Sequence, residues 1–197
     1  MTSTTAESRS LILASASPYR RELLERLNID FNVQVADIDE SIPPEEPAHL
    51  AVLRLAEIKA AGIAAQNPDS IVIGSDQIAL LGEKILGKPH TRDQAKEQLR
   101  KCSGQKVDFL TAITVTDNDK ADHDVDITRV KFRDIDSTTI DRYLDADKPY
   151  DCAGAIRSEG LGVSLLEAID SRDPTALIGL PLIALARILR SFGYRIP

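Results

Sequence analysis

The sequence has 197 residues, of which 43% are hydrophobic, so the chain is long enough for one substantial core and too polar for a membrane span. A formal net charge of -7 argues against general binding to nucleic acid or anionic membranes, because clustered Lys and Arg hold polyanions. The 2 cysteines are too few for a disulfide framework, and residues 1–10 lack the apolar segment of a signal peptide, so we expect a cytoplasmic protein without membrane partners.

Helix and strand patterns alternate along the chain without internal repeats, which predicts an α/β fold. Residues 1–9 are expected to form a flexible tail, and residues 10–197 a single domain. The predicted strands cover residues 11–14, 31–35, 70–81, 106–116, 124–133 and 162–169. The predicted helices cover residues 18–27, 48–65, 91–101, 137–145 and 181–192. The turn at residues 117–123 is expected to reach into solvent.

The segment Ser15-Ala16-Ser17-Pro18-Tyr19-Arg20 directly follows the first strand and predicts a phosphate-binding helix start. Ser17 is a good N-cap, and Pro18 suits the first helical position. The free backbone N–H groups of this turn, two hydroxyls and Arg20 can converge on one anion, and the small residues allow close approach. An ordinary capped helix with an exposed arginine is the competing interpretation.

Two acidic segments are candidate metal or catalytic sites. Residues 37–46 contain five acids and no base; one or two of these carboxylates suit a hard divalent cation, whereas the alternative is a solvated acidic loop. The apolar run 71–73 ends in Gly74-Ser75-Asp76, where α/β proteins place ligand-contacting groups. Asp76 is therefore a candidate general base or metal ligand, and the apolar pattern that resumes at 78–81 weakens the alternative of a turn cap.

Two lysines are candidate phosphate ligands. Residues 82–89 match the phosphate-loop pattern except at the last position, where Pro89 has neither a hydroxyl nor an N–H, so a Walker-type ATPase is rejected. Lys88 still supplies a point charge that reaches a phosphate. Lys59 lies in the otherwise apolar stretch 56–61, and a solvated surface lysine is the alternative there.

The segment 152–160 is typical of a pocket wall, because two glycines bracket a base, Arg157, and an acid, Glu159. A buried Glu159 needs donor partners, and the Watson–Crick edge of guanine offers N1–H and the 2-amino group. Cys152 has no CxxC partner and is interpreted as a buried small residue. The 3 histidines are dispersed and form no zinc motif.

Five motifs occur in the order and spacing of the Maf family of nucleotide pyrophosphatases, which the chain resembles from residue 10 to its C-terminus: Ser-x-Ser-Pro-x-Arg, Asp39-Glu40-Ser41, Gly74-Ser75-Asp76, Gly87-Lys88-Pro89 and Cys152-Ala153-Gly154. The resemblance implies a mixed sheet with flanking helices, in the elongated two-lobed fold of Maf and ITPase-like proteins, with the active cleft between the lobes. It also implies a homodimer as the common assembly.

Within this family the chain looks most like the YceF subfamily, which the resemblance links to hydrolysis of 7-methyl-GTP to 7-methyl-GMP and diphosphate. Tyr19, Gln77 and Glu159 differ from the residues of the subfamily that acts on dTTP and UTP. N7-methylation makes guanine cationic, so the ring of Tyr19 can stack on it and Glu159 can accept from its edge. Related chains often carry Trp at position 19 and Lys at position 157, and the weaker π face of Tyr bears on affinity and selectivity.

The resemblance also implies a role for each candidate residue. Asp76 would accept the proton of the attacking water. The base would be read by Tyr19, Gln77 and Glu159. The triphosphate would be held by Ser15, Ser17, Arg20, Lys59 and Lys88. A divalent cation, Mg²⁺ or Mn²⁺, would be held by Glu40 and Asp76. The alternatives are a pyrophosphatase for dTTP, UTP or a broader set of non-standard nucleotides, and a non-catalytic nucleotide-binding regulator of septum formation.

Overall fold

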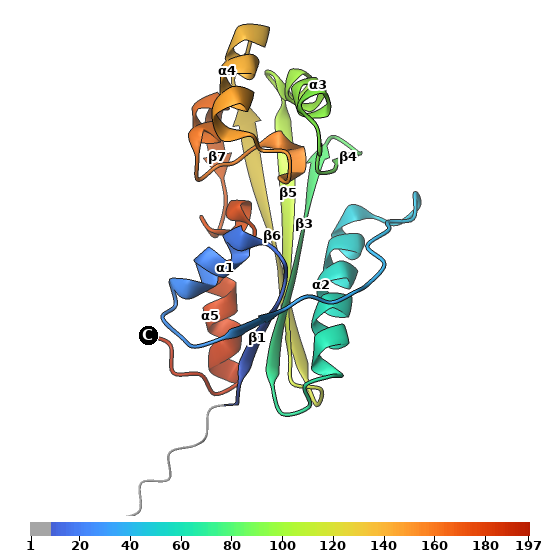
Figure 1. The fold of residues 1–197 in the computed structure, drawn as a ribbon, viewed down its shortest axis with the longest axis vertical. Helices are drawn as coiled ribbons and strands as arrows, with labels where there is room; N and C mark the ends of the chain where they lie inside the picture. The colour runs from blue at the N-terminus through green and yellow to red at the C-terminus, as the bar shows by residue number, and fades with distance from the viewer. Residues whose placement is uncertain (1–8) are drawn as a thin grey trace, which may run out of the picture.

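The computed structural model describes residues 9–197, which form a mixed seven-stranded sheet with helices packed against it (Figure 1). The α/β class and the mixed sheet are thereby confirmed. The predicted tail over residues 1–9 lies outside the described residues except for Arg9, so the tail and the single domain over residues 10–197 stay predictions. None of the helices in the described part of the chain has the length and apolar character that a membrane crossing requires.

The elements follow one another in the predicted alternation. The strands are β1 (Leu11–Ala14), β2 (Asn32–Gln34), β3 (Ile71–Leu81), β4 (Lys84–Leu86), β5 (Lys106–Thr116), β6 (Ala121–Phe132) and β7 (Leu166–Asp170). The α-helices are α1 (Pro18–Glu25), α2 (Ala48–Ala64), α3 (Arg92–Cys102), α4 (Ser137–Asp147) and α5 (Leu182–Ser191). Three short 3-10 helices are η1 (Ala153–Ala155), η2 (Leu161–Leu165) and η3 (Ala176–Ile178).

The sheet has the strand order β2-β1-β3-β5-β6-β7, and β4 pairs with β3 outside this path. The strand β1 is parallel to β2 and β3, whereas the other neighbours are antiparallel. The register pairs Ala14 with Gly74. Consequently the loop that follows β1 and the middle of β3, which carries Asp76, lie at the same place along the sheet.

Helices cover both faces of the sheet at β1, which is why this strand is buried along its whole length. Leu11 and Leu13 belong to a core cluster with residues of α1 and α5. Ile12 and Ala14 belong to a cluster with residues of α2 on the opposite face. Figure 1 shows the same arrangement, with α2 on one side of the strands and α1 and α5 on the other.

A further core cluster occupies the other end of the long strands. There Phe109 of β5 and Phe132 of β6 pack with Leu99 of α3 and Leu144 of α4. Figure 1 shows an elongated molecule, with α3 and α4 at one end and α1, α2 and α5 at the other. The long strands β3, β5 and β6 connect the two ends.

Three local predictions need correction. The three-residue strand β4 was not predicted, because a strand this short within a hairpin has too few residues to show a period. The strand β6 begins at Ala121 instead of residue 124, so the turn before it is shorter than predicted. Asp117 in this turn is buried instead of solvated, because its carboxylate accepts hydrogen bonds from Arg9 and from the backbone N–H of Lys120. The strand β7 begins at Leu166, because the apolar residues before it form the 3-10 helix η2.

Candidate active site

The centre of the candidate site lies where α2 crosses β3. A Cβ atom at Gly74 would lie 2.1 Å from the carbonyl oxygen of Ala56, so only glycine allows the helix to approach the strand this closely. Close packing sets Lys59 of α2 beside Asp76 of β3, with Nζ 2.6 Å from Oδ1, and each residue is only 8% exposed. Lys59 is therefore a buried partner of Asp76 and not a solvated surface lysine.

The acidic loop between β2 and α2 contributes Glu40, whose Oε1 lies 3.2 Å from Nζ of Lys59. This loop is tied to α2 by Arg54, which donates from Nε and Nη2 to Glu46 at 2.7 and 2.6 Å and from Nη2 to the carbonyl of Ser41 at 3.1 Å. The carboxylate of Glu40 thus meets the same ammonium as Asp76. Four of the five acids of this loop are exposed, as the alternative of a solvated acidic loop expects, but Glu40 also pairs with the buried Lys59.

The start of α1 has the geometry that the sequence predicts for an anion site. The hydroxyl of Ser17 accepts from the backbone N–H of Arg20, as an N-cap should. The hydroxyl of Ser15 accepts from the backbone N–H of Ser17 and from Nη1 of Arg20, at 3.2 and 3.3 Å. Burial lowers the pKa of the Arg20 guanidinium, while Asp76 and Glu40 act in the opposite direction. Arg20 is therefore held at the start of α1 by Ser15 and is only partly exposed.

The loop around Gly179 orients side chains from two other segments. The carbonyl oxygen of Gly179 accepts hydrogen bonds from Nε of Arg20 at 2.9 Å and from the hydroxyl of Ser75 at 3.0 Å. A φ of 127° at this position favours glycine. Sequence reasoning missed Gly179, since a glycine before the Leu-Pro pair predicts a turn but gives no indication of which distant donors its carbonyl meets.

Gln77 points its amide nitrogen away from solvent. Nε2 donates to Oγ1 of Thr111 and to the carbonyl oxygens of Ala176 and Leu177, at 2.9, 3.0 and 3.1 Å. Because carbonyl oxygens only accept, these contacts fix the orientation of the amide. The oxygen Oε1 of Gln77 is consequently the atom left to accept a hydrogen bond from a ligand. Thr111 and η3, which set this orientation, were not predicted from the sequence.

The opposite wall contains Tyr19, Arg157 and Glu159. The guanidinium carbon of Arg157 lies over the ring of Tyr19, 5.8 Å from its centroid, and Nε lies 3.4 Å from Oε1 of Glu159. Burial, followed by the neighbouring Cys152 and Asp151, raises the pKa of the Tyr19 hydroxyl above its ordinary value, so that hydroxyl is protonated at neutral pH. Burial likewise raises the pKa of the Cys152 thiol to about 12, which agrees with its interpretation as an unreactive small residue, although it is only half-buried.

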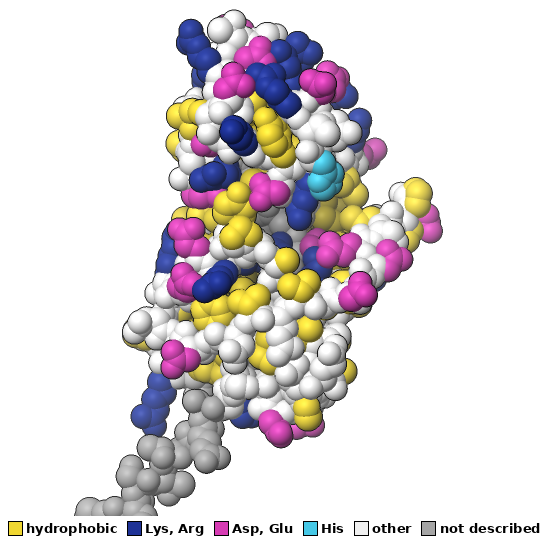
Figure 2. All heavy atoms as spheres, viewed as in Figure 1, with side chains coloured by type: hydrophobic (Ala, Val, Ile, Leu, Met, Phe, Trp, Pro, Cys, Tyr) yellow, Lys and Arg dark blue, Asp and Glu magenta, His cyan; other side chains and the backbone are white. Residues whose placement is uncertain are grey.

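One pocket of about 670 Å³, called the main pocket below, is lined by residues from these segments. Its lining includes the ten residues proposed from the sequence: Ser15, Ser17, Tyr19, Arg20, Glu40, Lys59, Asp76, Gln77, Lys88 and Glu159. Lys88 reaches it from the segment after β4 and is exposed. Figure 2 shows acidic and basic side chains interspersed on the face drawn, around a hollow at mid-height. The chain brings the predicted residues together, from six separate segments.

The main pocket presents two carboxylates of the kind that suit a divalent cation. Glu40 and Asp76 both approach Nζ of Lys59, within 3.2 Å, and present hard carboxylate oxygens. Residues 9–197 contain no group of three His, Cys, Asp or Glu side chains placed to hold a metal ion by themselves. A cation held by these two carboxylates would need further ligands from outside the described residues.

Fold and site together define an α/β protein with a pocket lined by a helix start, basic side chains and carboxylates. The Maf-like protein family matches residues 10–192. A 7-methyl-GTP pyrophosphatase of Alkalilimnicola ehrlichii is 52% identical over 191 residues, which cover 96% of each chain. The 7-methyl-GTP pyrophosphatase of Xanthomonas axonopodis pv. citri is 50% identical over 187 residues, covering 95% of this chain and 98% of the relative. That of Nitrosococcus oceani is 47% identical over 187 residues, covering 94% of each. The chain belongs to the Maf family.

Proposed function

We propose that this protein is a nucleoside triphosphate pyrophosphatase that hydrolyses 7-methyl-GTP to 7-methyl-GMP and diphosphate, which removes a modified nucleotide. The observation that carries the proposal is the Glu40–Lys59–Asp76 cluster in a pocket that also contains the start of α1. Full-length relatives at about 50% identity bear the name 7-methyl-GTP pyrophosphatase, which supports the substrate. The family resemblance supports a cytoplasmic homodimer.

The triphosphate would lie between the start of α1 and the two lysines. Backbone N–H groups at a helix start bind anions, and Ser15, Ser17 and Arg20 add hydrogen-bond donors in a fixed arrangement. Lys88 makes no ion pair within residues 9–197, so its charge is available to a phosphate. Lys59 stands next to the carboxylates, where it would neutralise the phosphates nearest to the reaction.

Asp76 is proposed as the proton acceptor. Its Oδ1 is engaged by Lys59 at 2.6 Å, and no hydrogen bond within the described residues engages Oδ2, which is left to orient and deprotonate a water molecule. Attack of that water on the α phosphorus would break the bond to the bridging oxygen and release diphosphate. A divalent cation held by Glu40 and Asp76 would supply charge neutralisation on the phosphate oxygens.

The base would be recognised by Tyr19, Gln77 and Glu159. The oxygen of the Gln77 amide and the carboxylate of Glu159 are acceptors, and the Watson–Crick edge of guanine presents two adjacent donors. A uracil or thymine base presents one such donor, so acceptor groups favour guanine. The family's two-lobed arrangement is part of the proposal: the end with α3 and α4 and the end with α1, α2 and α5 would form the lobes, with the main pocket as the active cleft.

Release of diphosphate from 7-methyl-GTP, GTP, dTTP, UTP and CTP, measured with Mg²⁺ and with Mn²⁺, tests this function. We expect preference for 7-methyl-GTP and loss of that activity in Asp76→Asn. Preference for dTTP or UTP would instead support the alternative pyrophosphatase and contradict the role of the base-reading trio. Binding without turnover of any of these nucleotides would favour the non-catalytic regulator.

A further inference from the structure

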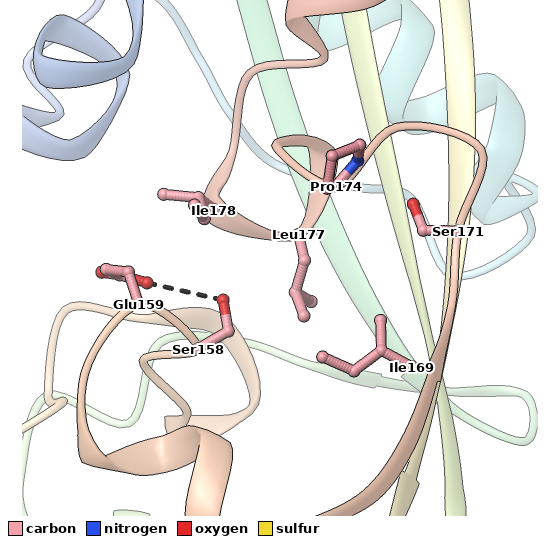
Figure 3. A pocket seen from close by; sticks show the side chains of 7 residues that line it. All are labelled: Ser158, Glu159, Ile169, Ser171, Pro174, Leu177 and Ile178. Carbon is pink, nitrogen blue, oxygen red and sulfur yellow. Dashed lines mark hydrogen bonds between the residues drawn. The ribbon is translucent and has the colours of Figure 1, made fainter.

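A second pocket of about 350 Å³, called the side pocket below, adjoins the main pocket (Figure 3). The two pockets share Glu159, Leu177 and Ile178. Figure 3 shows the side pocket between the loop that carries Glu159 and the segment from β7 to η3, with Leu177 pointing between Ser158 and Ile169. None of the phosphate-binding candidates lines it, so it extends the site on the base side.

Resting on the proposed function, we propose that the side pocket receives the N7-methylated guanine base. Its walls are apolar and suit the faces of a planar ring: Ile169, Pro174, Leu177 and Ile178. Ile169 is 45% exposed on β7, which is a large apolar side chain left facing solvent at the pocket. A bound ring would cover it, and the methyl group of the modified base would add apolar contact.

The polar groups of the side pocket have the sign that a cationic ring requires. Glu159 stands at the boundary with the main pocket, and only the hydroxyl of Ser158, at 3.5 Å, approaches its Oε2. At the other side, Ser171 donates to the carboxylate of Asp126, which is 3% exposed. The cation nearest to Asp126 is the well-exposed Arg172, at 3.6 Å, and solvent screens an exposed charge more than a buried one. Glu159, paired with Arg157 at 3.4 Å, thus brings one carboxylate to the pocket, and Asp126 places a second behind Ser171.

The contacts of Tyr19 link it to Glu159 at the boundary of the two pockets. One face of the Tyr19 ring carries the guanidinium of Arg157, and its hydroxyl donates to Asp151 at 3.4 Å. Arg157 in turn reaches Glu159. Tyr19 thus helps to read the base by fixing Arg157 and, through it, Glu159. With the ring in the side pocket, the Watson–Crick edge would meet Gln77 and Glu159 at the boundary with the main pocket.

The test compares the wild-type protein with Ile169→Trp, which fills the side pocket, and with Ile127→Trp. Ile127 is 50% exposed on the adjacent strand β6, on the opposite face of the sheet, and lines neither pocket, so its variant is the matched control. The KM for 7-methyl-GTP and the inhibition constant of inorganic triphosphate are measured for each. We expect Ile169→Trp to raise this KM by about tenfold or more and to leave triphosphate inhibition within about twofold. The control should change neither.

A KM within about twofold of wild type in folded Ile169→Trp would overturn the base assignment, and so would an equal weakening of 7-methyl-GTP and triphosphate. If the Trp variant does not fold, Ile169→Ala replaces it; we expect a rise of about threefold in KM from the lost apolar contact, and an unchanged KM overturns the proposal. A wild-type protein that binds 7-methyl-GTP without hydrolysing it refutes the proposed reaction alone. In that case the dissociation constant of 7-methyl-GTP is measured for the same variants, and its ratio to the wild-type value decides the base assignment.

Discussion

The substitution Asp76→Asn should affect activity and stability to very different degrees. It removes the proposed proton acceptor while preserving the shape of the side chain, so we expect turnover of 7-methyl-GTP to fall by about 100- to 10,000-fold. It also removes the charge that faces Lys59 at 2.6 Å in a site where both residues are 8% exposed. A hydrogen bond to a charged group contributes about 1.5–3 kcal/mol, and the remaining carboxylate of Glu40, at 3.2 Å, limits the loss to that range.

The assay combines steady-state release of diphosphate with thermal and urea unfolding. For a chain of this size, a loss of about 1.5–3 kcal/mol lowers Tm by about 3–12 °C. Asp108→Asn is the matched control, because Asp108 pairs with Arg129 at 2.7 Å on the surface of the same sheet; it should cost less than about 1 kcal/mol and leave turnover unchanged. Turnover within about tenfold of wild type in a folded Asp76→Asn protein would refute the reasoning.

Three further changes have defined outcomes. Gly74→Ala forces a Cβ atom to 2.1 Å from the carbonyl oxygen of Ala56 in α2. Urea unfolding should therefore show a free energy of unfolding lower by at least about 1–3 kcal/mol, together with reduced turnover. Wild-type stability would contradict the close approach of helix and strand. Arg54→Ala releases the loop that carries Glu40 from α2. The Mg²⁺ concentration for half-maximal activity should therefore rise, with little loss of Tm. An unchanged Mg²⁺ titration would exclude a role of Arg54 in positioning Glu40. Burial raises the pKa of the Cys102 and Cys152 thiols from 9.0 to about 12, so the unfolded state loses these protons at lower pH than the folded state. The stability of the folded state should therefore fall between pH 9 and 12. A Tm that stays flat over this range would contradict the burial of the thiols.

Local features of the fold were predictable from the sequence because they depend on neighbouring residues. The cap of α1 at Ser17 and that of α3 at Thr91 follow from side chains that bond to the next turn of their own helix. The apolar run at residues 11–14 predicts a strand, which β1 confirms. The short strand β4 and the 3-10 helix η2 were missed, because neither has a period long enough to distinguish it from a loop or a strand.

The candidate site was partly predictable, because each motif supplies residues of one chemical kind at one chain position. Lys59 shows the limit: its surroundings in sequence allow a surface lysine, and only the packing of α2 on β3 makes it the partner of Asp76. The carbonyl of Gly179, more than a hundred residues from Ser75 along the chain, orients that side chain and Arg20 through contacts that no local pattern encodes. The side pocket depends in the same way on segments distant in sequence.

The most direct test of the account is the identification of products from 7-methyl-GTP hydrolysed in isotopically labelled water. The account predicts 7-methyl-GMP and diphosphate in equal amounts, with the labelled oxygen on the 7-methyl-GMP, because water attacks the α phosphorus. Formation of 7-methyl-GDP and phosphate, or labelled diphosphate beside unlabelled 7-methyl-GMP, would contradict it.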